Sequence, residues 1–315
     1  MSTALLDNAL SSLFPIPHVI TNILIIYLSV RHVRPCLVRI YALHLSFPSL
    51  FFAIYSMVAS VVQFAGDTTH MRLSTEGRLS AFVDDLTDFF IYFCSYDYRV
   101  IAVVLIIITY VSFAEPLWIK HFTARKVNAC FFAAHFFTAV CSYISAMSPN
   151  QAEIVFVGSP SAKRVGVDWT DYWEAAFEWS TFVAFLVFYV ICIRAVYAFK
   201  KNQLVMTQVT NRDDQAQLEK QLRAILLYVT PPNLFLLLST FCTDLFTTFI
   251  PPETPVYNQI CEAKTHFFNT FLEARLFIAS FTLLLTFADY RKAFLAVFCK
   301  KGWSIVRGQY TSSWF

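Results

Sequence analysis

The stretch IYFCSYDYRVIAVVLIIITY, residues 91–110, decides the fold because it places two charged side chains inside an otherwise apolar run. A helix needs roughly 20 apolar residues to cross a bilayer core about 30 Å thick, and this run has that length. Similar runs recur along the chain, which is 57% hydrophobic and only 14% charged. Polar residues are too few to cover a soluble globule, so the sequence predicts an all-α integral membrane protein.

Further apolar runs, bounded by charges or prolines, lie on both sides of this one. We expect seven membrane-spanning helices, at about residues 12–30, 40–64, 85–113, 127–147, 173–199, 219–249 and 265–288. Residues 1–300 would form one seven-helix domain, followed by a short cytosolic tail at 301–315. Most connections are short, so no separate soluble domain is predicted.

Lysine and arginine are distributed unevenly between alternate loops. About sixteen fall in the loops after the first, third, fifth and seventh spans, against about five in the opposite loops. Because basic loops stay in the cytosol, we expect the N-terminus outside and the C-terminus inside. The alternation holds only for seven spans, so it also supports that count.

Two acid–base pairs are predicted to lie inside the membrane, where an unpaired charge would be costly. Asp97 and Arg99 lie more than one helical turn from either end of their run, and Glu273 and Arg275 have the same spacing in the last run. Residues two apart point to nearly opposite sides of a helix, so we expect pairing across the two helices. The predicted pairs are Asp97 with Arg275 or Arg99 with Glu273, acting as a polar switch. A static polar clamp or a water-filled interior is the alternative.

Aromatic side chains cluster in the predicted outer halves of the third, fifth and seventh spans. They would either line a mostly apolar ligand pocket or serve as ordinary packing and interfacial anchors. One face of the third span repeats Asp84, Asp88, Ser95 and Arg99 at helical spacing, which favours an inward, polar surface. The candidate ligand-binding residues are Asp88, Phe89, Tyr92, Phe93, Trp173, Trp179, Phe267 and Phe271.

The sixth run contains Pro231 and Pro232, which remove backbone hydrogen bonds and should kink the helix. The kink would be either a hinge or a static bend. Before it, residues 217–226 read as an amphipathic extension into the cytosol.

After the last span, residues 289–299 carry apolar side chains at helical spacing beside basic ones. This pattern predicts a short amphipathic helix on the inner leaflet. Cys299 would be either a palmitoylation site or an unmodified thiol.

The seven histidines form no HxxH pair, and neither a phosphate-binding loop nor a nucleophile elbow is present. A lipid-modifying membrane enzyme would need a histidine or carboxylate constellation near one leaflet, and none is visible. We therefore expect no enzyme, no metal, no cofactor and no nucleic-acid partner.

Several residues resemble the motifs of G-protein-coupled receptors. Asn22 looks like their first-helix asparagine, Ser49 stands where their second helix has a sodium-binding aspartate, and Tyr110 keeps the tyrosine of their Asp-Arg-Tyr motif. The phenylalanine-rich core and the sequence YRKAF at residues 290–294 are similar to the nematode serpentine chemoreceptors. The resemblance extends over nearly the whole chain, from about residue 13 to residue 299.

This resemblance implies a chemosensory receptor of the plasma membrane, including that of sensory cilia. A small-molecule or peptide cue would bind among the outer halves of the helices, and a heterotrimeric G protein would bind in the cytosol. The implied G-protein contacts are Thr109, Tyr110, Arg125, Lys126, Lys220, Arg223 and Arg291. The alternative is a multi-pass transporter or channel in which the four intramembrane charges mark the path.

Overall fold

The computed structural model describes residues 15–69, 78–114, 123–146, 169–203, 220, 222–233, 259 and 268–298. All regular structure in these residues is helical, which confirms the predicted all-α fold. The helices are α2 (Pro15–Arg31), α3 (Leu37–Thr69), α4 (Arg78–Ala114), α6 (Ala124–Ala146), α7 (Trp169–Gln203), α11 (Phe268–Thr286) and α12 (Ala288–Phe298). Residues 222–233 are also helical.

Four helices in the described part of the chain are long and apolar enough to cross a membrane. Their spans are Leu37–Val58, Asp88–Val111, Ala124–Ala146 and Tyr172–Ala195. The bent pair α11–α12 makes a fifth if it is counted as one span, and α2 is a shorter apolar helix of 17 residues. The predicted sixth run is described only over residues 220 and 222–233.

Helices α3, α4 and α7 extend beyond both ends of their predicted apolar runs. The longest, α4, has 37 residues, and α3 continues through Pro48 as far as Thr69. A helix rises 1.5 Å per residue, so α4 is about 56 Å long and exceeds the thickness of a bilayer core. Loss of hydrophobicity does not end a helix, which explains why apolar runs alone underestimate these lengths.

Bulky apolar side chains lie on the outside of the bundle. Phe132 and Phe136 of α6 are 65% and 73% exposed, and similar residues line the outward faces of α2, α3 and α7. Charged side chains such as Asp97 are buried. This distribution is the reverse of a soluble protein's and fits a bundle surrounded by lipid.

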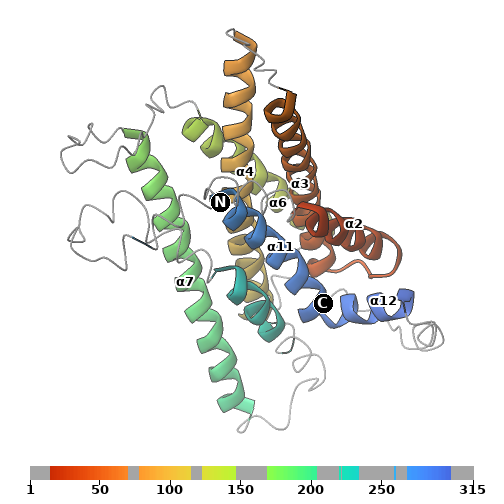
Figure 1. The fold of residues 1–315 in the computed structure, drawn as a ribbon. Helices are drawn as coiled ribbons and strands as arrows, with labels where there is room; N and C mark the ends of the chain where they lie inside the picture. Colours follow the sequence, from red (N-terminus) through yellow and green to blue (C-terminus); the bar gives the residue numbers. More distant parts are fainter. Residues whose placement is uncertain are drawn as a thin grey trace.

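Helix α4 occupies the centre of the described bundle and contacts α3, α6 and α7 (Figure 1). Helix α2 packs against α3 and α11, and α12 contacts both α2 and α11. Residues on opposite sides of α4 therefore contact different helices.

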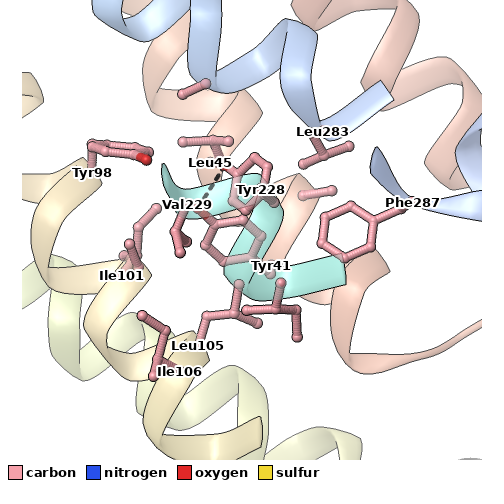
Figure 2. Close-up of a cluster of buried hydrophobic side chains, with 14 of the residues drawn as sticks. Tyr41, Leu45, Tyr98, Ile101, Leu105, Ile106, Tyr228, Val229, Leu283 and Phe287 are labelled. Carbon is pink, nitrogen blue, oxygen red and sulfur yellow. Dashed lines mark hydrogen bonds between the residues drawn. The ribbon is translucent and has the colours of Figure 1, made fainter. Parts of the chain in front are cut away.

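An apolar cluster joins α3, α4, the 222–233 segment and α11. Tyr41 and Tyr228 lie in it, and their hydroxyl oxygens are 2.8 Å apart, as the dashed line in Figure 2 marks. In the 222–233 segment Leu222 and Ile225 are buried whereas Arg223 is exposed. The predicted amphipathic pattern is thus confirmed where the segment is described.

A sharp bend separates the last two helices. The axes of α11 and α12 differ by 85° across Phe287. Tyr290 and Ala293 of α12 are buried against the bundle, whereas Arg291 and Lys292 are exposed. The predicted short amphipathic helix after the last apolar helix is confirmed.

Candidate functional site

All four predicted intramembrane charges are buried. Asp97 and Arg99 of α4 are each 3% exposed, Glu273 of α11 is 1% exposed and Arg275 is 5% exposed. With their partners they form four hydrogen-bonded groups that we call together the polar core. Its members are His18, His44, Ser95, Asp97, Arg99, His135, Glu178, Glu273 and Arg275.

The predicted pairing of these charges is wrong. Asp97 accepts a hydrogen bond from His135 of α6, with 2.6 Å between Oδ1 and Nδ1. Arg99 donates from Nη2 to Oε1 of Glu178 in α7, over 2.8 Å. The two α4 side chains do diverge as expected, but they point towards α6 and α7 rather than α11.

The two charged side chains of α11 contact α2 and α4. Oε2 of Glu273 lies 2.9 Å from Nδ1 of His18 in α2. Arg275 reaches α4 but binds neutral groups there, donating to the carbonyl and the hydroxyl of Ser95, each at 3.2 Å. The link between these two helices is therefore one arginine on uncharged oxygens, not an ion pair.

A chain of hydrogen bonds connects α3, α6 and α4. Asn128 Oδ1 lies 3.1 Å from His44 Nε2, and His44 Nδ1 lies 3.0 Å from His135 Nε2. The other nitrogen of His135 binds Asp97. The tautomers of His44 and His135 set the direction of each of these bonds.

Polar contacts also join α2 to α11. The amide of Asn22 donates to the His18 carbonyl, and its oxygen accepts from the hydroxyl of Ser280 at 3.1 Å. Asn22 is completely buried. It thus bridges the first and last apolar helices of the described bundle.

The structure separates the predicted ligand-binding residues into two groups. Phe89 stacks on Phe93, and Phe93 lies beside His135. On another side of α4, Tyr92 and Trp173 pack around Tyr96, Cys141 and Phe177. We call this second group, which joins α4, α6 and α7, the aromatic cluster.

The remaining ligand candidates are Trp179, Phe271, Asp88 and Phe267. Trp179 packs edge-on against Phe182 of its own helix, and Phe271 is half-buried. Asp88 is also half-buried. Phe267 lies outside the described residues.

Most predicted G-protein contacts are accessible. Arg125, Lys126, Lys220, Arg223 and Arg291 are exposed, and Tyr110 is half-buried. Thr109 differs, because it is buried and its hydroxyl donates to the Leu105 carbonyl.

The described helix 222–233 continues through both prolines. Thr230 donates to the Leu226 carbonyl and Asn233 to the Val229 carbonyl, so side chains bond to this stretch of backbone. The residues beyond 233, where a kink would be measured, lie outside the described part, as does Cys299.

Sequence reasoning missed the partners of the charges. These are His18, His44, His135 and Glu178. Histidine was considered only in metal-binding spacings, although an ionisable residue inside any apolar run is a functional candidate. That rule would have found all four.

Among the described residues, no three histidine, cysteine or acidic side chains come together in a way that could hold a metal ion. No protein-family model matches the chain, and no curated protein matches it. The polar core and the arrangement of the helices are therefore the observations from which a function can be inferred.

Proposed function

We propose that the chain is a seven-span chemosensory G-protein-coupled receptor similar to the nematode serpentine receptors, with its N-terminus outside the cell. A small-molecule or peptide cue binds among the outer halves of the helices and shifts a two-state bundle by its differential affinity for the two states. The proposed location is the plasma membrane, including that of sensory cilia.

The observation that carries this proposal is the 85° bend between α11 and α12. A last apolar helix followed at once by a short amphipathic helix is the arrangement expected from the receptor resemblance. The exposed Arg291 and Lys292 of α12 suit the headgroups of an anionic inner leaflet.

A route from the interior to the cytosolic side also supports the proposal. Tyr98 follows Asp97 on α4, and its hydroxyl is close enough to Arg275 and Tyr228 for electrostatic interaction. Tyr228 lies three residues before Pro231 (Figure 2). A ligand that moved Arg275 would therefore act on the helix whose exposed Lys220 and Arg223 are proposed to contact the G protein.

The test is G-protein dissociation measured by energy transfer in cells that express the chain and each Gα class in turn. We expect basal or cue-dependent dissociation for one class. Reversing Lys126 or Arg223 to glutamate should reduce it at equal surface expression, whereas Arg31→Glu, at an exposed arginine of α2, serves as the charge-matched control. Substrate flux without G-protein dissociation over a panel of cues would overturn the proposal.

A proton-coupled transporter is the second candidate, and the His44–His135–Asp97 chain favours it. Chains of buried histidine and carboxylate groups are used as proton relays in transporters. Proteoliposomes loaded with a pH-sensitive dye would report proton flux, and His135→Gln should abolish it. A flat trace for the wild-type protein under a pH gradient would exclude this candidate.

A further inference from the structure

Two buried arginines lie near each other in the polar core. Arg99 comes from α4 and Arg275 from α11, and each is at most 5% exposed. Their charges are close enough to repel, and both interact with Glu178 of α7. Three helices therefore meet at this point.

Glu178 of α7 lies against these arginines. It forms a salt bridge with Arg99 and interacts electrostatically with Arg275. The other two acidic side chains of the polar core bind histidines, Asp97 to His135 and Glu273 to His18.

Both arginines carry unused hydrogen-bond donors. Among the described residues, Nε and Nη1 of Arg99 and Nε of Arg275 are buried and have no hydrogen-bond partner. Guanidinium N–H groups bind carboxylates more strongly than they bind neutral oxygens. A bound carboxylate would satisfy these donors.

Apolar rings lie next to this site. Phe177 directly precedes Glu178, and it packs on Tyr96, which lies one helical turn before Arg99. The indole Nε1 of Trp173, in the same aromatic cluster, is also buried without a hydrogen-bond partner among the described residues. A ligand with an acidic end and an apolar body would suit this combination, since most ligand sites pair a few polar groups with apolar walls.

We propose that Arg99 and Arg275 bind the carboxylate of a small organic acid whose apolar part lies against the aromatic cluster of α4, α6 and α7. The proposed binding of this acid does not depend on whether the protein signals to a G protein. The inference that this acid is the activating cue rests on the proposed receptor function.

The ligand class is tested with acetate, phenylacetate and octanoate, each beside its neutral amide, and with chloride. We expect phenylacetate or octanoate to raise the unfolding temperature more than its amide, acetate or chloride. Arg275→Gln should weaken this response at least tenfold in ligand concentration, Arg275→Lys should weaken it less, and Arg31→Gln should leave it unchanged. The site would be overturned if a carboxylate raised the unfolding temperature no more than its amide did. It would also be overturned if the carboxylate raised that temperature as much in Arg275→Gln as in the wild-type protein. If the carboxylate binds but no G protein dissociates, the receptor function is overturned and the site is not. If a cue activates the G protein and still binds to Arg275→Gln, the site is overturned and the receptor function is not.

Discussion

Nδ1 of His135 lies 2.6 Å from Oδ1 of Asp97 and joins α6 to the central helix α4 inside the bundle. Asp97 is 3% exposed, so water does not replace this partner. The second nitrogen of His135 continues the contact to His44 on α3. One imidazole therefore connects three helices.

Removing this imidazole should destabilise the protein. His135→Ala leaves the buried carboxyl group of Asp97 without its hydrogen-bond partner, which should cost about 1–3 kcal/mol. His135→Gln retains a hydrogen-bond donor and should cost less. Chemical unfolding in mixed micelles measures both, and equal stability of wild type and His135→Ala would contradict the assignment.

Tyr41 and Tyr228, whose hydrogen bond Figure 2 marks, provide a test with a matched pair of variants. Tyr228→Phe leaves the buried hydroxyl of Tyr41 without its partner, which should cost about 1–2 kcal/mol. Removing both hydroxyls in Tyr41→Phe/Tyr228→Phe should cost less than the sum of the single changes. The same unfolding assay gives the double-mutant cycle, and strictly additive losses would show that the hydroxyls are not coupled.

The sequence was sufficient to predict an all-helical fold, helices long and apolar enough to cross a membrane, and the burial of Asp97, Arg99, Glu273 and Arg275. These predictions depend on the free energy of transfer into an apolar medium, which can be estimated from residue type and position in a run. The amphipathic α12 was predictable for a related reason, because its basic and apolar residues alternate at helical spacing.

The partners of those charges could not be predicted in the same way. Which helix Asp97 faces depends on the rotation of α4 about its axis, and that rotation is set by packing against α3, α6 and α7. The sequence gives the angle between Asp97 and Arg99 but not the identity of the neighbouring helix. Acid–base matching alone therefore selected α11 and missed His135 and Glu178.

The contact between Ser29 and Tyr290 should hold α12 against the bundle. Their hydroxyl oxygens are 2.6 Å apart, and both side chains are fully buried. Tyr290→Phe removes the hydrogen bond between α2 and α12, so backbone amides of α12 should exchange with solvent severalfold faster. Hydrogen exchange by mass spectrometry compares the variant with Tyr27→Phe, which changes an exposed tyrosine of α2. Unchanged exchange in α12 would show that apolar contacts alone hold it.

Cys36, in the short connection between α2 and α3, should react slowly with alkylating reagents at neutral pH. Burial raises the pKa of its thiol above the usual 9.0, and the nearby carboxylate of Asp289 in α12 raises it further. Only the thiolate reacts, so the rate should keep rising about tenfold per pH unit up to pH 9 without a plateau. A variant that retains Cys36 as its sole cysteine, followed by mass spectrometry with iodoacetamide, measures this rate. Asp289→Asn should increase the rate at pH 8 whereas Asp289→Glu should not, and a plateau below pH 9 would contradict the raised pKa.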